Sequence, residues 1–237
     1  MIPTSKTKPV FDLSKYHWLI YGQPKIGKST FASQFDNVLF IPTEPGLNAL
    51  EIYKATDKEY IDSWDEFKTI VDELVNLSKQ NKLTFKMACI DTIDILYDLC
   101  LDSVCKKNGW EHPADQAFGK GWNAVNTEFK TNILRLANVV KIIFVSHATE
   151  KEVEIKKIKM NRTQPTISGK SGEFVMGMVD MIGYISTYTQ NNIVERVVYF
   201  IGHDGLVAGD RTNRMGKAVK FDFGQIKKQF EERKEVK

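Results

Sequence analysis

The sequence has few cysteines and lacks the long apolar runs that anchor a chain in a membrane. Its three cysteines, Cys89, Cys100 and Cys105, are an odd number, and none has zinc-ligand spacing. Cys89 and Cys100 lie in apolar or amphipathic segments, which indicates reduced core residues. No apolar run approaches the roughly 20 residues that cross a bilayer, and the start lacks the apolar segment of a signal peptide. We therefore expect a soluble cytoplasmic protein without a membrane partner.

Neither sign of charge dominates the sequence. The 33 lysines and arginines and 30 aspartates and glutamates give a formal net charge of +3. This balance permits nucleic-acid binding without arguing for it, so the positions of the charges matter more than their sum. The 237 residues contain no internal repeat or low-complexity segment. We expect an N-terminal arm at 1–15, one domain at 16–225, and a charged tail at 226–237 that is helical or frayed.

Short apolar runs alternate with segments of helical periodicity. Strands are expected at 17–21, 38–42, 87–90 and 142–146, and a late pair at 179–186 and 196–202. Helical periodicity follows the first strand and recurs at 63–74, where Ser63 and Glu66 form a capping-box pattern, and near 93–104 and 122–136. The alternation predicts an α/β fold with a mainly parallel sheet, helices on both faces, and late strands that extend the sheet.

Residues 21–30, YGQPKIGKST, fit the phosphate-loop pattern G-x-x-x-x-G-K-S/T between a buried strand and a helix. Its glycines let backbone N–H groups approach phosphate oxygens. Lys28 is expected to reach the β and γ phosphates, and Ser29 to bind Mg²⁺, so the predicted cofactors are ATP and Mg²⁺. Lys25 is expected to point to water. The predicted nucleotide-binding residues are Gly22, Gln23, Pro24, Lys25, Ile26, Gly27, Lys28, Ser29 and Thr30.

Polar side chains follow the other three core strands. Asp91 ends the third strand and is a candidate Mg²⁺ ligand or a helix cap, with Asp94 as the second metal candidate. Glu44 follows the second strand and is either a general base or a solvated loop residue. Ser146 and His147 end the fourth strand, where His147 either senses the γ-phosphate or is structural.

The phosphate loop, FIPTEPGLNAL, ACIDTIDIL and IIFVSHAT, in this order and spacing, resemble the RecA-like ATPase core over roughly residues 16–225. The resemblance implies that Glu44 is the catalytic glutamate and Asp91 the Walker B metal residue. It also implies that His147 couples the γ-phosphate to a DNA-binding loop, although RecA itself has a glutamine there. AFGKGW at 117–122 and a GDRTNR segment are similar to phage-encoded proteins of this superfamily, among them single-strand annealing recombinases of the Sak group. This similarity implies a protein that is encoded by a phage and located in the cytoplasm of its bacterial host.

The resemblance also implies two loops that bind single-stranded DNA, at 107–122 and 148–173. The segment from Ile155 to Lys170 contains no acidic residue, and flexible cations suit a phosphate backbone. A solvated loop or hairpin is the alternative. Trp110 is expected to stack on bases, whereas Trp122 is expected to pack in the core. The candidate DNA-binding residues are Lys156, Lys157, Lys159, Arg162, Lys170, Trp110 and Lys120.

Arg211 and Arg214 lie near the end of the sequence. The resemblance implies that one of them reaches the γ-phosphate of a neighbouring subunit, as a catalytic arginine finger in trans. Such a finger requires a head-to-tail homo-oligomer, either a ring or a filament. The alternative is that these arginines cap the sheet or contact DNA.

The predicted function is an ATP-hydrolysing, single-stranded DNA-binding protein that promotes annealing or homologous recombination. Single-stranded DNA and a head-to-tail homo-oligomer are the expected partners, and a single-strand DNA-binding protein is a further candidate. Two alternatives stay open, namely a DNA motor of the helicase or translocase type and a nucleotide-switched regulatory module. A small-molecule kinase is disfavoured because no lid-like arginine cluster follows the core.

Overall fold

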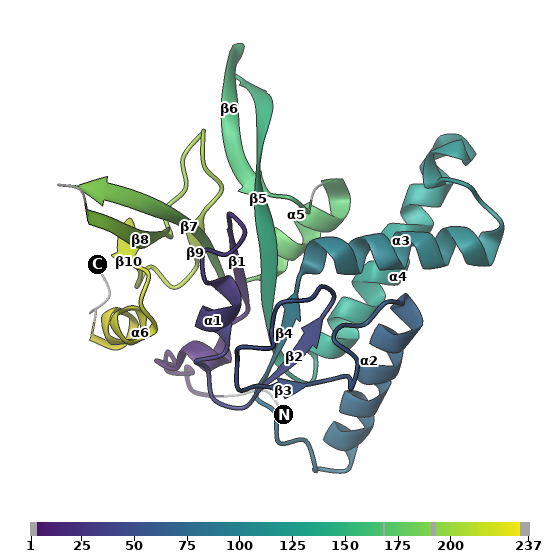
Figure 1. Ribbon diagram of the computed structural model, residues 1–237, viewed down its shortest axis with the longest axis horizontal. Coiled ribbons are helices and arrows are strands. Elements are labelled where there is room, and N and C mark those ends of the chain that lie inside the picture. Colours follow the sequence, from purple (N-terminus) through teal and green to yellow (C-terminus); the bar gives the residue numbers. More distant parts are fainter. Residues whose placement is uncertain (1–3, 168, 191–192, 233–237) are drawn as a thin grey trace.

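A single mixed sheet forms the centre of the protein. The computed structural model describes residues 4–167, 169–190 and 193–232. The strand order is β10-β8-β7-β1-β5-β4-β2-β3 (Figure 1). The strands from β7 to β3 in that order are parallel to one another, whereas β8 pairs antiparallel with β7 and β10 pairs antiparallel with β8. The α/β fold predicted from the sequence, with late strands that extend the sheet, is confirmed.

The parallel strands lie between two helical layers. They are β1 (Trp18–Gly22), β2 (Val38–Pro42), β3 (Tyr53–Lys54), β4 (Met87–Asp91), β5 (Lys141–Ile155) and β7 (Met181–Gln190). Every residue of β1, β2 and β4 is buried. Burial on both faces explains why these strands read as continuous apolar runs rather than as alternating patterns. The four expected core strands are therefore present, but β5 continues well beyond its expected end.

Helices pack on both faces of the sheet. One face is covered by α2 (Trp64–Lys79), α3 (Ile93–Asn108), α4 (Lys120–Ala137) and α5 (Gly169–Met178), the other by α1 (Lys28–Ala32) and α6 (Phe223–Glu232). Alternate residues of β1 serve the two cores, because Leu19 packs with the first group of helices and Trp18 and Ile20 with the second. The sheet thus holds two hydrophobic cores together.

Ser63 begins α2 as its pattern predicts. The Ser63 hydroxyl accepts a hydrogen bond from the Glu66 N–H at 3.3 Å. The Glu66 carboxylate, however, accepts from the N–H of Asp62 at 3.0 Å rather than from that of Ser63. The Ser63 hydroxyl thereby satisfies one of the four N–H groups that the first turn of a helix leaves free, which stabilises the helix start.

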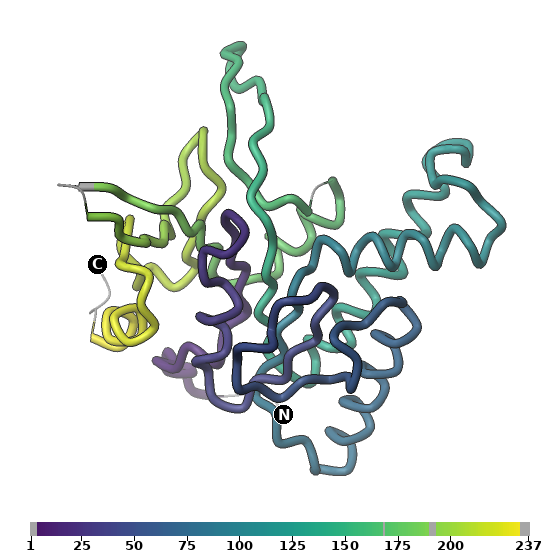
Figure 2. The backbone as a smooth tube through the Cα atoms, viewed as in Figure 1, coloured from purple at the N-terminus to yellow at the C-terminus, as the bar shows by residue number. Residues whose placement is uncertain are grey.

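The two expected loops are more ordered than the sequence suggests. In 107–122, α3 runs to Asn108, two 3₁₀ turns cover Pro113–Asp115 and Ala117–Gly119, and α4 begins at Lys120. In 148–173, β5 and β6 (Ile158–Pro165) form a long hairpin that projects beyond the sheet (Figure 2), and α5 begins at Gly169. The hairpin that was the alternative for 148–173 is therefore confirmed over β5 and β6, whereas 107–122 contains short helical turns in place of a continuous loop.

The two ends of the domain also differ from expectation. Ile226 and Phe230 of α6 are buried in the core beneath α1, so the packed domain continues past residue 225. Residues 233–237 of the predicted tail and 1–3 of the predicted arm lie outside the described residues. The rest of the arm ends in a 3₁₀ turn over Leu13–Lys15.

The late strands close one edge of the sheet. β7 pairs with β1 in parallel and with β8 (Ile193–Tyr199) as an antiparallel hairpin, which extends the sheet as expected. The short strands β9 (Gly209–Asp210) and β10 (Ala218–Lys220) pair with β7 and β8. None of the helices in the described ranges is long and apolar enough to cross a membrane.

His17 gives the fold a pH dependence that can be measured. Burial, with the nearby Lys141 ammonium, lowers the pKa of His17 from 6.5 to about 4. Its Nδ1 accepts a hydrogen bond from the Ile142 N–H at 3.0 Å, which requires the neutral ring. Because the unfolded chain binds this proton more readily, we expect the free energy of unfolding to fall by up to about 3 kcal/mol as pH drops from 6.5 to 4.

Denaturant titrations across this pH range test the expectation. His17→Gln should remove most of the extra loss of stability between pH 6.5 and 4, and the exposed His203→Gln is the control. An identical pH slope for the wild type and His17→Gln would contradict the role of His17.

Candidate nucleotide-binding site

The phosphate loop connects β1 to α1 at the carboxyl edge of the sheet. β1 ends at Gly22 and α1 begins at Lys28. A Cβ on Gly22 would lie 2.6 Å from the Ile185 carbonyl oxygen of β7, so only glycine permits this close approach. Gly27 has φ +103°, a conformation that side chains disfavour. The pattern glycines are thus required by the geometry of the loop. Lys25 is exposed, in agreement with the expected orientation toward water.

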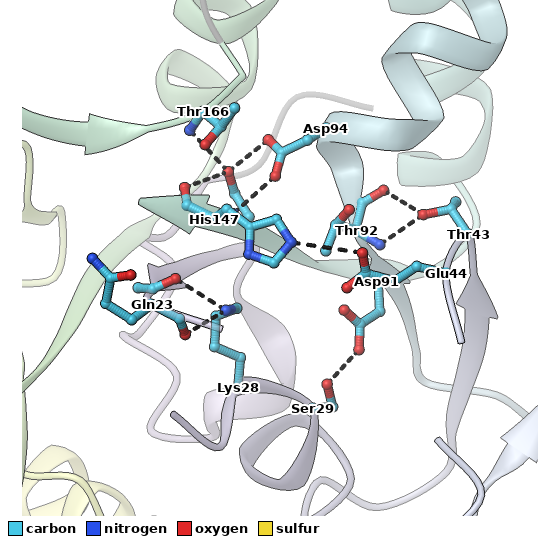
Figure 3. Close-up of polar contacts among 12 residues, drawn as sticks. Gln23, Lys28, Ser29, Thr43, Glu44, Asp91, Thr92, Asp94, His147 and Thr166 are labelled. Atoms are coloured by element: carbon cyan, nitrogen blue, oxygen red, sulfur yellow. Dashed lines mark hydrogen bonds and ion pairs between the residues drawn. The ribbon is translucent and has the colours of Figure 1, made fainter. Parts of the chain in front are cut away.

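Lys28 lies inside the loop. Its ammonium donates hydrogen bonds to the carbonyl oxygens of Gly22 and Gln23, both at 3.0 Å (Figure 3). Burial lowers the pKa of Lys28, while the charges of Asp91 and Glu44 act in the opposite direction. A cation held among carbonyls, close to two carboxylates, is suited to a phosphate group that adds negative charge.

Ser29 and Asp91 meet as phosphate-loop and Walker B residues are expected to. The Ser29 hydroxyl donates to the Asp91 carboxylate at 2.6 Å. Burial raises the pKa of Asp91, which is opposed first by the bond from Ser29. The neighbouring Thr92 hydroxyl is buried and has no hydrogen-bond partner among the described residues. A hydroxyl and a carboxylate oxygen side by side, with an unpartnered hydroxyl nearby, form a donor set that fits Mg²⁺.

Glu44 and His147 face one another across the same edge. The His147 Nε2 and a Glu44 carboxylate oxygen are 3.6 Å apart (Figure 3). His147 Nδ1 is buried, and no partner for it occurs in the part of the chain that the structure describes. Thr43 holds the base of this arrangement, because its hydroxyl donates to the Thr92 carbonyl at 2.9 Å and accepts from the Thr92 N–H at 2.8 Å. The backbone next to Glu44 is thereby held beside the end of β4, which carries Asp91.

Asp94 has a different place from the one expected. Its carboxylate accepts hydrogen bonds from the Ser146 hydroxyl at 2.7 Å, the His147 N–H at 2.8 Å and the Ile167 N–H at 2.9 Å. Burial raises the pKa of Asp94, and these bonds oppose that shift. A carboxylate already engaged by three donors is a poor metal ligand, so Asp94 joins α3, β5 and the segment before α5 instead.

A family model described as an AAA domain matches residues 14–212 of this chain. The chain belongs to this AAA domain family. The match begins just before β1 and includes the phosphate loop, Glu44, Asp91 and His147.

Other comparisons are more distant. The SPbeta prophage-derived protein YorG of Bacillus subtilis strain 168 is 29% identical over 133 residues, which are 55% of this chain and 40% of that protein. The match therefore spans less than half of the relative. A KaiC-like protein from Pyrococcus horikoshii has 14% identity and a TM-score of 0.43, with 78% of each chain covered. The flagellar accessory protein FlaH from Methanocaldococcus jannaschii has 13% identity and a TM-score of 0.40, with 86% and 83% covered.

Arg196 of this AAA domain contacts the phosphate loop, and no pattern in the sequence indicates that contact. From β8, its guanidinium donates to the carbonyl oxygen of Ile26 inside the phosphate loop at 3.0 Å. The same group lies over the Phe221 ring, 6.0 Å from its centroid. The phosphate loop and Arg196 are separated by 170 residues, and only the pairing of β8 with β7 brings them together.

Both of the predicted finger arginines contact other residues of the same chain. Arg214 is 6% exposed, donates to the carbonyl oxygens of Phe230 and Glu231, and lies over the Phe11 ring. Its burial corrects the prediction that it reaches a neighbouring subunit. Arg211 has an exposed side chain that pairs with Asp180 at 3.0 Å, at the start of β7. This position lies at the opposite edge of the sheet from the phosphate loop.

The predicted DNA-binding residues of the hairpin differ in their surroundings. Lys156 and Lys157 are exposed at its tip, where both have positive φ. Lys159 pairs with Glu152 at 3.1 Å, and Arg162 donates to the Asp204 carbonyl at 2.8 Å. Lys170 is exposed at the start of α5, some distance along the chain from the hairpin.

The two tryptophans exchange their expected places. Trp110 packs against the core covered by α2–α5, whereas Trp122 is 36% exposed on α4. The helical periodicity predicted α4 correctly, but the neighbouring helices cover the apolar face of α4 only from Val125 onward and leave Trp122 in the first turn partly exposed. Lys120 is exposed at the start of the same helix.

The metal-binding role predicted for Ser29 can be tested separately from its role in the fold. We expect Ser29→Ala to weaken binding of ATP with Mg²⁺ at least about tenfold, since even outer-shell partners of a metal contribute 10–100-fold. Binding without Mg²⁺ should change little. Calorimetric titration with Mg²⁺ and with a chelator measures both. Ser33→Ala is the matched control, because that hydroxyl bonds only to the nearby Thr30 carbonyl at 2.9 Å; an equal loss in both variants would contradict the assignment.

Arg196 is expected to act as a positioning residue for the phosphate loop. Arg196→Ala should weaken ATP binding by about 1 kcal/mol, roughly fivefold, and increase amide hydrogen exchange in the loop. Arg196→Lys should restore the affinity only in part, because lysine lacks the planar fork that lies over Phe221. The control is Lys220→Ala, which removes an exposed pair with Glu195 on the same edge of the sheet. Unchanged exchange in Arg196→Ala would exclude the positioning role.

Proposed function

We propose that this AAA domain is a Mg²⁺-dependent ATPase that binds single-stranded DNA and promotes annealing or homologous recombination. The observation that supports the ATPase is the convergence of Lys28, Ser29, Asp91, Glu44 and His147 at one edge of the sheet. These residues come from four different strand ends, so only the fold brings them together.

Each of these groups has a chemical role in the proposal. Lys28 binds the β and γ phosphates, and Ser29 and Asp91 hold the metal, which when bound neutralises charge on the phosphates. Glu44 accepts a proton from the attacking water, for which a partly exposed carboxylate beside the phosphate loop is suited. His147 adjoins Glu44 and orients it, with its second ring nitrogen directed to the buried side.

One β-strand, β5, connects this site with the hairpin that is proposed to bind DNA. β5 carries Ser146 and His147 at the ATP site and then continues to Ile155 as one half of the projecting hairpin. A change in the contacts of His147 therefore acts on the same strand, β5, that forms half of the hairpin. This continuity supports the proposal that ATP binding and DNA binding are coupled.

The hairpin has two chemically different faces. In its register, Lys151 lies opposite Arg162, and apolar side chains lie opposite one another between this pair and the tip. The alternate positions, Glu150, Glu152 and Glu154, share the other face. The Lys151 face and the tip lysines together suit a polyanion with apolar bases.

Three finer elements complete the proposal. The prophage origin of the relative in Bacillus subtilis supports a phage-encoded protein that works in the host cytoplasm. Assembly is head to tail, as a ring or a filament, and exposed Arg211 is the remaining arginine that a neighbouring subunit would meet. A single-strand DNA-binding protein would present the strand.

Phosphate release tests the proposed catalysis. We expect Glu44→Gln to lower ATP turnover about 10²–10⁴-fold, the usual contribution of a general base, while ATP binding persists. Glu51→Gln, an exposed glutamate in the same segment, is the control. In the wild type, oligothymidylate should stimulate turnover and bind less tightly as salt rises. Full turnover in Glu44→Gln would exclude Glu44 as the base.

The same experiments distinguish the alternative functions. Annealing of complementary strands without directional unwinding agrees with the proposal, whereas ATP-driven unwinding or translocation on duplex DNA would favour a motor. Binding of ATP with negligible turnover, with or without DNA, would favour a regulatory module.

A further inference from the structure

A cavity of about 660 Å³ lies beside the ATP site, between α3, α4 and the segment that precedes α5. Its volume is within the range of small-ligand pockets. Tyr97 of α3, Phe118 and Trp122 supply aromatic surface, and Asp94 and Asp98 lie along its α3 side. The cavity belongs to neither the phosphate loop nor the hairpin.

We propose that this cavity binds one unstacked nucleobase of the single strand and reports its presence to the ATP site through Asp94. The inference rests on the proposed DNA binding and adds to it a base-binding site distinct from the hairpin.

The aromatic side chains favour a flat ring as the occupant. Phe118 is 96% exposed and has φ 56°, so the backbone holds a large apolar side chain in solvent at the rim. Trp122, in the first turn of α4, makes an edge contact with His112, whose ring centroid is 5.4 Å from its own. Exposed aromatic side chains fixed at the mouth of a pocket are what base stacking requires.

Polar groups in the lining match the edge of a base. The Asn126 amide oxygen accepts from the Tyr97 hydroxyl at 3.2 Å and from the Ser171 hydroxyl at 2.7 Å, which fixes the orientation of the amide. Asn123 and Asp98 add a further amide and a carboxylate. Every nucleobase presents a comparable mixture of donors and acceptors along one edge.

Charges of opposite sign line different sides of the cavity. Asp94 is partly buried and Asp98 is exposed, both on α3, whereas Lys170 lies at the start of α5 and also lines a smaller adjoining cavity of about 260 Å³ with Lys130. The Lys130 ammonium lies over the Phe174 ring, 5.3 Å from its centroid. A nucleotide fits this arrangement with its base inside and its phosphates along the two lysines, since phosphate would be repelled by Asp94 and Asp98.

Asp94 connects the cavity with the ATP site. The carboxylate that lines the cavity also receives the hydrogen bonds from Ser146, His147 and Ile167. His147 in turn faces Glu44 (Figure 3). Ile167 is itself part of the cavity wall. A base that displaces this wall therefore alters contacts of the residue next to the proposed general base.

Fluorescence anisotropy with two labelled oligomers tests the inference. One is oligothymidylate, and the other is an abasic strand of equal length and charge. We expect the wild type to prefer oligothymidylate at least about fivefold, and Trp122→Ala to lose that preference without a change in salt dependence. Trp122→Phe should retain it, which separates stacking from misfolding. Tyr53→Ala, which truncates an exposed aromatic side chain that does not line the cavity, is the control and should behave as the wild type.

The outcomes separate the two levels of the proposal. Salt-sensitive binding with an undiminished base preference in both Trp122→Ala and Phe118→Ala would overturn the cavity as the base site while DNA binding stands. Absence of salt-sensitive binding of either oligomer by the wild type would overturn both. Stimulation of ATP turnover by oligothymidylate but not by the abasic strand is the result expected from the connection through Asp94; equal stimulation by both would overturn that connection.

Discussion

Burial of the central parallel strands on both faces is the constraint on which the rest of this structure depends. Because β1, β2 and β4 have no solvent-exposed face, polar side chains along them would be buried without partners. Polar chemistry is therefore confined to the strand ends, and parallel strands bring those ends to one edge. Glu44, Asp91 and His147 are neighbours for this reason, although the chain separates them by more than a hundred residues from first to last.

Asp94 illustrates how a buried charge becomes an organising element. Removing a carboxylate from water is costly, and three donors from β5 and the segment before α5 compensate for that cost. The same bonds fix the positions of those segments relative to α3. Asp94, which connects the sheet with the segment before α5, thus also lies between the candidate nucleotide site and the cavity beside α3 and α4.

Local patterns predicted the strands, the phosphate loop and the start of α2, because apolar runs, glycine spacing and capping residues act over a few neighbouring positions. Arg196 and the hydrogen bonds of Asp94 could not be predicted, since they depend on pairing between distant strands and segments. Trp110 and Trp122 were exchanged for a related reason: helical periodicity gives the apolar face of a helix but not how far its neighbours cover it. The core position of Phe230 was hidden by the charges around it.

The hairpin of β5 and β6 gives each molecule a projecting element whose two faces differ in charge. A polyanion that approaches the Lys151 face meets cations and apolar side chains, whereas one that approaches the Glu152 face meets three carboxylates, of which Glu152 is already paired with Lys159. In any assembly of equally oriented copies, the Lys151 faces of all hairpins would point in the same direction. The Glu152 faces would repel a nucleic-acid strand, so the strand would bind along one side of the assembly and not along both.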